Sequence, residues 1–396
     1  MSSRQMSNEQ IVTIGYISSS DPFKDRNSWS GTIYKVREAI ELSGCKVIWI
    51  SYKKNFLPVL IIKSLLKVFA KIFAKNTMLD HIKIIGKLQA FTINKAALHK
   101  CDYLFFSGQS FLLSNLKTEK PIIYYSDAAF NLMPDYYWHN LASWNIKQGH
   151  EIERAALDKS SIIIHASKWA SKSAIDFYNA LETKCHVLEF GANLDDYDIE
   201  KAEPYKIGCE LKVLFSGVDW ERKGAEIAIE TVDWLNKNNI RTKLIIVGLN
   251  SIPEEYENLP FIENVGFLDK NIENQYEKYT SIIKQSHLLL LPTKGECAGI
   301  VFSEASAYGL PIFTYDTGGI ANYVINGYNG YRLPLSEKSE AFAHKIMECI
   351  NQNKLSELKE GGVQLYREKL SWKSWSERFR EILSSLSEAQ AVGGGQ

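Results

Sequence analysis

The sequence is poor in the features that mark several large classes of protein. It has six cysteines in 396 residues, and none of them forms a CxxC pair or lies at zinc-finger spacing from a histidine. Such cysteines are typical of reduced thiols in the cytosol. No run of 18 uncharged apolar residues is present, so no membrane-spanning helix is expected. The polar start, MSSRQMSNEQ, lacks the apolar core of a signal peptide, and we therefore expect a cytoplasmic location.

The sequence also lacks an excess of charge of either sign. Lys plus Arg and Asp plus Glu are both 46, which argues against a dedicated nucleic-acid-binding protein. The motifs GxxxxGK[ST], HExxH and a strand-borne GxGxxG are absent, which disfavours P-loop, zinc-protease and dinucleotide-binding sites. One DxD motif, Asp196–Asp198, falls in a polar stretch and is interpreted as part of a solvated linker. We therefore predict no metal site.

Short β-branched runs alternate with amphipathic stretches, a pattern typical of βαβ units and parallel sheets. A helix is predicted over Thr32–Ser43. The strands predicted in the first half are Ile11–Ile17, Lys46–Ser51, Tyr103–Phe106, Ile122–Tyr125, Ser161–Ala166 and His186–Phe190. A polar stretch, Asp195–Glu210, then interrupts the series, which predicts a domain boundary.

The same alternation restarts after this boundary. The predicted strands are Lys212–Gly217, Lys243–Gly248, Leu288–Pro292 and Pro311–Tyr315, and helices are predicted over Gly224–Lys237 and Ser371–Ser384. The sequence thus predicts an α/β protein with two Rossmann-like, doubly wound parallel-sheet domains that face a cleft. We expect an N-terminal domain over 1–200, a C-terminal domain over 201–370, and a segment 371–396 whose helix crosses back to the N-terminal domain before a tail.

The segment Leu288–Leu333 contains two carboxylates close to the end of a buried strand. Glu296 lies in the loop after the strand, and Glu304 lies about one turn into the following helix. Carboxylates accept hydrogen bonds in pairs, which suits the diols of ribose or hexose. The helix start near Ile300 and Val301 offers free N–H groups and a positive dipole end to a diphosphate. Both carboxylates are therefore predicted to reach one ligand.

These residues resemble the donor site of the family 4 retaining glycosyltransferases, which have the double-Rossmann GT-B fold. The resemblance rests on Glu296-x7-Glu304 with the flanking stretches Ala307–Pro311 and Thr317–Ile320. Upstream, Ser216–Gly224 resembles the family's phosphate-contacting loop, and Asn264–Leu268 resembles the strand end that recognises the base.

The resemblance implies a role for each matching residue. Lys223 would hold the donor diphosphate, Glu296 would address the transferred sugar, and Glu304 would hold the ribose. The remaining donor contacts that it implies are Gly217, Gly299, Ile300 and Val301 near the phosphates and Phe267 and Leu268 near the base.

One position departs from the family pattern. The family usually places an arginine five residues before the lysine, and here that position is Val218. The adjacent Arg222 is a candidate for supplying the guanidinium. In the N-terminal half, Gly31 is a candidate for close backbone approach to a phosphate, and Asp127 for positioning the acceptor hydroxyl or the donor sugar.

The resemblance implies transfer of a hexose or hexosamine from a nucleoside-diphosphate sugar to a glycan or lipid-linked acceptor, with retention of configuration. It implies no metal, no cofactor besides the donor, and a place in the synthesis of cell-surface polysaccharide or glycoconjugate. A nucleic-acid partner is not expected. Two alternatives stay open: a sugar-nucleotide epimerase on the same fold, which would convert the donor without an acceptor, and a non-catalytic sugar-nucleotide-binding protein.

A basic segment in the first half is a further candidate for binding. Between Lys53 and Lys100 there are ten lysines and one acidic residue, Asp80. Within residues 58–75 lysines recur every fourth position, which places them on one helix face. The pattern is typical of a helix that lies on the inner, anionic face of a membrane, or of a surface helix that packs its apolar side inward.

Overall fold

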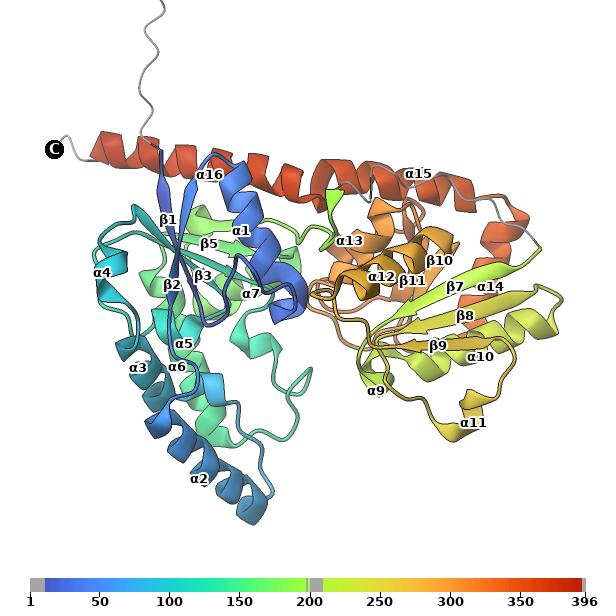
Figure 1. Ribbon diagram of the computed structural model, residues 1–396, viewed down its shortest axis with the longest axis horizontal. Coiled ribbons are helices and arrows are strands. Elements are labelled where there is room, and N and C mark those ends of the chain that lie inside the picture. Colours follow the sequence, from blue (N-terminus) through green and yellow to red (C-terminus); the bar gives the residue numbers. More distant parts are fainter. Residues whose placement is uncertain (1–10, 197–198, 200–208, 394–396) are drawn as a thin grey trace, which may run out of the picture.

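The computed structural model describes residues 11–196, 199 and 209–393. Within them the chain forms two six-stranded sheets, and every pairing between neighbouring strands is parallel. Figure 1 shows the two sheets in separate halves of the molecule, each covered by helices. The predicted fold class, two Rossmann-like α/β domains, is therefore confirmed.

The N-terminal sheet has the order β2-β1-β3-β4-β5-β6. Its strands are β1 (Thr13–Ser18), β2 (Lys46–Ser51), β3 (Tyr103–Ser107), β4 (Ile122–Ser126), β5 (Ile162–His165) and β6 (Cys185–Val187). Its larger helices are α1 (Thr32–Leu42), α2 (Leu57–Phe73), α3 (Lys83–Phe91), α6 (Ser143–Lys159) and α7 (Lys168–Tyr178). Shorter turns are η1 (Ser28–Gly31), η2 (Leu79–His81), α4 (Lys95–Leu98), α5 (Ser110–Leu113), η3 (Phe130–Leu132) and η4 (Glu182–Lys184). The central strands are buried on both faces, because helices cover both sides of the sheet.

The C-terminal sheet has the order β12-β11-β10-β7-β8-β9. Its strands are β7 (Leu211–Ser216), β8 (Thr242–Val247), β9 (Ile262–Gly266), β10 (Leu288–Leu291), β11 (Ile312–Tyr315) and β12 (Gly330–Leu333). The helices are α9 (Trp220–Lys223), α10 (Ala225–Lys237), α11 (Glu254–Glu257), α12 (Glu273–Gln285), α13 (Ile300–Ala307), α14 (Ser339–Asn351) and α15 (Leu355–Leu365), with η5 (Ile320–Asn322) and the π-turn η6 (Tyr366–Leu370). Strand β7 is central, and the loop that follows it lies at the carboxyl edge where ligands of such sheets bind.

One predicted strand is shorter than expected. His186–Phe190 is predicted as a strand, but β6 ends at Val187. Beyond it the backbone bonds to the C-terminal domain, since the N–H of Phe190 donates to the hydroxyl of Tyr323 at 2.9 Å and its carbonyl accepts from Ser303 at 2.8 Å. The chain leaves the sheet here because its backbone partners lie in the other domain.

The last helix, α16 (Trp372–Gly393), packs on α1 of the N-terminal domain and runs along that half of the molecule (Figure 1). Trp375 is fully buried, stacks on Phe379 at 4.8 Å, and donates its indole N–H to the hydroxyl of Tyr125 at 3.1 Å. Most of the predicted boundary Asp195–Glu210, with part of the DxD motif, lies outside the described residues, as do 394–396 of the predicted tail.

Within the described part of the chain, no helix is long and apolar enough to cross a bilayer. The basic segment forms α2, which lies at the end of the N-terminal domain away from α16 (Figure 1).

Candidate active site

A cavity of about 350 Å³ lies between the two domains at the carboxyl ends of both sheets. Its N-terminal wall comes mainly from the loop before α1, and its C-terminal wall from the loops after β7, β9 and β10 and from the start of α13. The predicted site residues that line it are Asp127, Gly217, Lys223, Phe267, Leu268, Glu296, Gly299, Ile300, Val301 and Glu304. Residues almost 180 positions apart in the sequence therefore line a single cavity, which is large enough for a small ligand.

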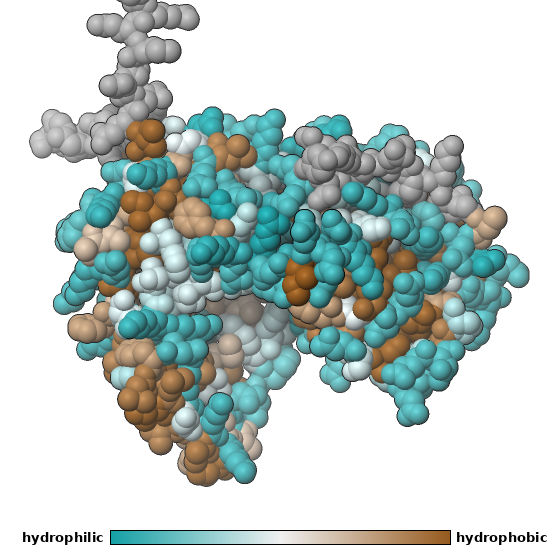
Figure 2. Space-filling view, in the orientation of Figure 1, coloured by the Kyte–Doolittle hydropathy of each residue, from teal (hydrophilic) through white to brown (hydrophobic). Residues whose placement is uncertain are grey.

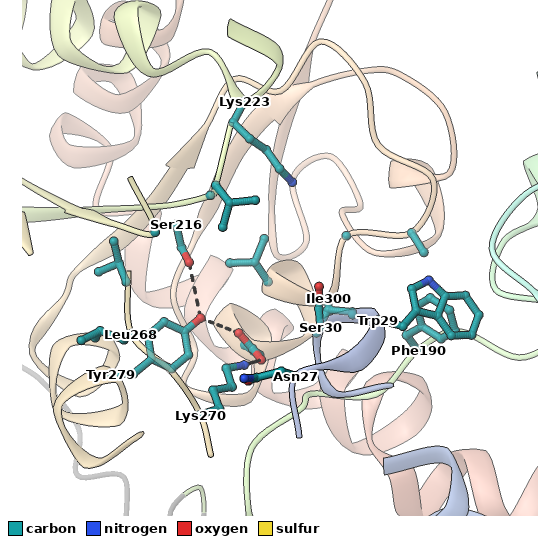
Figure 3. Close-up of a pocket in the computed structure, with 18 of the residues that line it drawn as sticks. Asn27, Trp29, Ser30, Phe190, Ser216, Lys223, Leu268, Lys270, Tyr279 and Ile300 are labelled. Carbon is teal, nitrogen blue, oxygen red and sulfur yellow. Dashed lines mark hydrogen bonds and ion pairs between the residues drawn. The ribbon is translucent and has the colours of Figure 1, made fainter. Parts of the chain in front are cut away.

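Glu304 is the centre of a polar cluster on the wall of this cavity. Its side chain is 3% exposed, and its two carboxylate oxygens accept from Lys270 at 2.6 Å and from the hydroxyl of Tyr279 at 2.5 Å. Burial and the adjacent carboxylate raise the pKa of Tyr279 well above its usual value, so this hydroxyl stays a donor. A carboxylate offers roughly four acceptor positions, so about two remain for hydroxyls of a ligand. Figure 3 shows Ser216, Tyr279 and Lys270 close together on this wall, where the hydroxyl of Tyr279 also lies 3.4 Å from that of Ser216.

Lys223 and Glu296 form an ion pair on another part of the wall. The side chains are only 12% and 11% exposed, and the ammonium contacts Oε2 of the carboxylate. Lys223 ends α9, a turn capped by Asp219, whose carboxylate accepts the N–H of Arg222 at 2.9 Å. A Cβ at Gly217 would lie 2.8 Å from the Lys223 side chain, so only glycine lets the lysine cross this loop into the cavity. The pair places a cation and an anion in direct contact where solvent reaches little of either side chain.

The loop that carries Glu296 is held by tyrosines of the opposite domain. The hydroxyl of Tyr136 accepts the N–H of Glu296 at 2.8 Å and bonds the hydroxyl of Thr317 at 2.9 Å. The hydroxyl of Tyr137 donates to the carbonyl of Gly295 at 3.2 Å. These contacts fix the loop backbone, so the N-terminal domain positions the carboxylate of the C-terminal domain.

The start of α13 forms part of the cavity wall. Gly299 is the N-cap residue with φ of +58°, and a Cβ there would lie 2.4 Å from the ring of Phe302. The first helical residues, Ile300 and Val301, line the cavity. N–H groups in the first turn of a helix have no intrahelical acceptor, and with the helix dipole they favour an anion.

Apolar residues form the far end of the C-terminal wall. Phe267 and Val218 are 50% and 65% exposed although they line the cavity, and Leu268 lies next to them. Figure 3 shows Leu268 near Tyr279, on the side away from Trp29 and Phe190. A flat apolar edge of this kind suits a ring that stacks without being enclosed.

The loop before α1 has an unusual backbone. Trp29, Ser30 and Gly31 have consecutive φ values of +52°, +55° and +88°. Left-handed conformation costs a non-glycine residue roughly 1–3 kcal/mol, and such strain concentrates at functional sites. The strain places Trp29 edge-on against Phe190 at 5.1 Å on the cavity wall, with Ser30 beside it (Figure 3). Gly31 itself lines a smaller neighbouring pocket with Arg26 and is the N-cap of α1.

Asp127 lies where the two domains face one another, at the end of β4. The indole N–H of Trp29 donates to its carboxylate at 3.4 Å. Burial, with a contribution from the negative charge of Glu296, raises the pKa of Asp127 from 3.8 to about 6. Asp127 therefore changes charge at a pH close to neutrality.

We expect this carboxylate to set the acid limb of the pH–rate profile. If its ionised form accepts a hydrogen bond from the acceptor hydroxyl, kcat/KM should fall about tenfold for each pH unit below about 6. The Asp127→Asn enzyme should be slower and should lack this limb. A wild-type profile that is flat between pH 7 and pH 5 would exclude the role.

The same shift predicts an effect on stability. Because the folded pKa is raised, the Asp127 contribution to the free energy of unfolding is present in full below 3.8 and is lost as the pH rises through about 6. The difference in thermal stability between Asp127→Asn and wild type should therefore change across this window, which thermal unfolding at several pH values measures.

Arg222 is not among the cavity-lining residues of the described chain. Its guanidinium donates to the carbonyl of Gly295 at 3.0 Å and to the hydroxyl of Tyr137 at 3.2 Å, and it lies 4.7 Å from the centre of the Tyr137 ring. In this structure it braces the loop and the interdomain contact, and the position of the missing family arginine, Val218, stays apolar.

Several cavity residues carry no signal in the sequence pattern. Lys270 and Tyr279 come from a loop and from α12, which no motif marks. Trp29 and Phe190 resemble ordinary core aromatics. The hydroxyl of Tyr136 reaches Glu296 across 160 residues of sequence. Only their proximity in the folded structure identifies these residues as part of the site.

A second cavity, of about 420 Å³, lies in the N-terminal domain and shares Trp29 and Asp127 with the first. Its wall is polar, with hydroxyls from the loops after β1, β3 and β4. Buried Glu153 also lines it, and burial raises the pKa of this carboxyl from 4.5 to about 7. The two cavities meet at Asp127. A ligand with many hydroxyls in the second cavity would therefore contact a ligand in the first cavity at this residue.

Comparison with known proteins agrees with this geometry. Residues 197–362 match the family model for Glycosyl transferases group 1. Over 222 residues the chain is 27% identical to the capsular polysaccharide biosynthesis glycosyltransferase CapM of Staphylococcus aureus, covering 52% of this chain and 56% of CapM. Alignments with the first curated relatives span 51–65% of the length of those proteins.

Solved structures resemble the chain over nearly its full length. Sucrose-phosphate synthase of Thermosynechococcus elongatus superposes with a TM-score of 0.66 at 16% identity, covering 96% of this chain and 100% of the other. HepE of Anabaena, in complex with UDP and glucose, gives 0.60 at 15% identity, covering 94% and 99%. These likenesses show that the two domains have the GT-B fold of glycosyltransferases.

Proposed function

We propose that this chain, whose C-terminal domain matches the group 1 glycosyl transferases, moves a hexose or hexosamine from a nucleoside-diphosphate sugar to a glycan or lipid-linked acceptor. The observation that carries the proposal is one interdomain cavity whose wall holds a buried carboxylate, Glu304, a cation, Lys223, and the start of α13. In the proposed complex Glu304 would hold the ribose, and Lys223 and the start of α13 would hold the diphosphate. The structure of HepE, which was solved with UDP and glucose, supports UDP as the nucleotide of the donor.

The chemistry follows from where charge grows. When the glycosidic bond breaks, negative charge develops on the leaving diphosphate. Lys223 and the N–H groups of Ile300 and Val301 are fixed donors on the wall where this charge would lie. With these groups in place the proposed reaction needs no metal. Glu296 would then hold the sugar hydroxyls, and no residue is assigned as a covalent nucleophile.

The acceptor would enter through the second cavity and approach the sugar at Asp127. We propose retention of configuration, in which the acceptor attacks on the face that the diphosphate leaves. The relative CapM acts in capsular polysaccharide biosynthesis, which supports an acceptor in cell-surface polysaccharide or glycoconjugate synthesis.

The first experiment is thermal unfolding of the protein with UDP, GDP, ADP and their common sugar forms. A ligand at about 100 times its Kd adds about 2.7 kcal/mol, which is readily measured. We expect one base to stabilise selectively. Release of nucleoside diphosphate with and without a glycan acceptor, in the presence of EDTA, then tests transfer and metal independence, and NMR of the anomeric proton tests retention.

The outcomes separate the alternatives. An epimerase would convert the sugar nucleotide without an acceptor. A binding protein would be stabilised by the nucleotide but would release no diphosphate with any acceptor. No stabilisation by any nucleotide, in folded protein, would contradict the proposed donor site.

A further inference from the structure

Helix α2 leaves large apolar side chains in solvent along its whole length. Leu57, Leu65 and Ile72 are 71%, 66% and 68% exposed. The other exposed apolar residues of the helix are Leu60, Ile61, Val68 and Phe73. Figure 2 shows this surface as a brown area at the tip of the N-terminal domain, where Figure 1 places α2.

These side chains are not needed to hold the helix on the domain. The inner face of α2 has its own apolar residues: Val59 is fully buried, and Leu66 and Phe69 pack inward. Phe69 meets the ring of Trp144 at 5.9 Å. A helix on a protein surface normally has one apolar face and one polar face. Helix α2 instead has a second apolar face, which the described fold leaves uncovered.

The exposed residues form one strip. Leu57, Ile61, Leu65, Val68 and Ile72 fall within about 80° of one another around the helix axis, at roughly 100° per residue. An apolar face of this width along four helical turns is wide enough to be buried together at the boundary between lipid headgroups and acyl chains.

A row of lysines runs along one edge of the strip. Lys63, Lys67 and Lys71 follow one another at every fourth residue, and α2 contains no acidic residue. Among the described residues none of the three forms an ion pair, although Lys63 donates to Asn55 at 2.7 Å. The edge of the strip is therefore a line of uncompensated positive charge.

We infer that α2 binds the surface of a bilayer that contains anionic lipid, with its apolar strip in the acyl boundary and its lysines on lipid phosphates. The lysine row favours this occupant over a second copy of the chain, because an antiparallel two-fold contact through α2 would place two such rows on the same side. In a bilayer the apolar acyl chains lie directly below the anionic phosphates. The apolar strip of α2 and the lysines beside it would contact these two layers at the same time.

The position of α2 connects this surface to the acceptor side of the molecule. The chain continues from α2 into Met78, Asp80 and His81, which line the second cavity. Resting on the proposed function, this continuity favours an acceptor that is itself anchored in the bilayer, such as a lipid-linked saccharide.

The test is flotation of the full chain with vesicles of phosphatidylcholine alone and of phosphatidylcholine with about a quarter phosphatidylglycerol. We expect binding to the mixed vesicles only, weakened by salt. Lys67→Gln/Lys71→Gln should lower partitioning about 25-fold, since each lysine near an anionic surface contributes about fivefold. Leu65→Ser/Ile72→Ser should lower it at least tenfold through lost apolar contact. Lys338→Gln/Lys373→Gln, exposed lysines in the C-terminal domain and on α16, should leave it unchanged.

Equal partitioning into neutral and mixed vesicles, or no effect of either α2 variant, would overturn the inference. So would sedimentation of a dimer that Leu65→Ser/Ile72→Ser separates, because a second copy would then cover the strip. Thermal unfolding checks that the variants fold. Flotation needs no nucleotide sugar and nucleotide stabilisation needs no vesicles, so failure here is distinct from failure of the proposed function.

Discussion

Replacing Lys223 by methionine should reduce transfer by about 10²–10³-fold, because the developing charge on the diphosphate loses its cation. The same change should destabilise the protein by about 3–5 kcal/mol, since the Glu296 side chain, of which only 11% is exposed, loses its cationic partner. The negative charge of Asp127 nearby adds to this cost. Chemical denaturation measures the stability, and release of nucleoside diphosphate measures the rate.

The double variant Lys223→Met/Glu296→Gln separates the two effects. Removing both charges of a buried pair is often close to neutral for stability, so the double variant should unfold near the wild-type midpoint while it stays inactive. If it regains activity together with stability, Lys223 acts only in the fold. The single variant Glu296→Gln should also be inactive and should lose stability for the same reason, because Lys223 is then left without its partner, while the backbone contact to Tyr136 persists.

Replacing Glu304 by alanine should weaken nucleoside-diphosphate binding by about 10²–10³-fold, because hydrogen bonds to a buried charged group are among the stronger ones. The carboxylate already holds Lys270 and Tyr279, which orient its free acceptor positions toward the cavity. Calorimetric titration with the nucleotide that stabilises the wild type gives the affinity.

The ligand provides the matching control. A 2′,3′-dideoxy nucleotide lacks the diol, so it should bind the wild type much more weakly than the ribonucleotide does and should bind Glu304→Ala about equally. Tyr279→Phe, which keeps the carboxylate and its lysine, should lose less than tenfold. A wild type that does not distinguish the two nucleotides would refute ribose recognition at this carboxylate.

The sequence is most informative where chemistry and topology coincide. β-branched runs predict the strands because both faces of a parallel strand are buried, and the order of runs and helices predicts two doubly wound domains. The motif around Glu296 and Glu304 predicts residues on one wall of one cavity, since loop and helix start are local features. The structure places both there, and their roles stay predictions.

The remaining features depend on contacts that sequence spacing does not encode. Trp29 and Ser30 adopt left-handed backbone that residue types of this kind rarely favour, so no turn rule predicts the loop. Arg222 lies in the loop that resembles the family's phosphate-contacting loop, but its guanidinium donates to Gly295 and Tyr137. The sequence does not predict this, because Tyr137 belongs to the other domain. The lysine spacing of α2 leaves two readings open, a helix on an anionic membrane or one that packs its apolar side inward, and the structure shows an inward face and an exposed apolar strip together.

The contact of Tyr136 with Glu296 makes the loop that carries Glu296 a shared component of both halves of the protein. Hydrogen bonds to the N-terminal half offset the entropy cost of ordering the residues around Glu296, so this wall of the cavity depends on the neighbouring domain for its shape. Ligand binding at this cavity and the docking of the two halves are then thermodynamically linked, and each biases the other by the same free energy. A C-terminal half produced alone would carry every donor residue of its own and still bind the donor more weakly than the full chain.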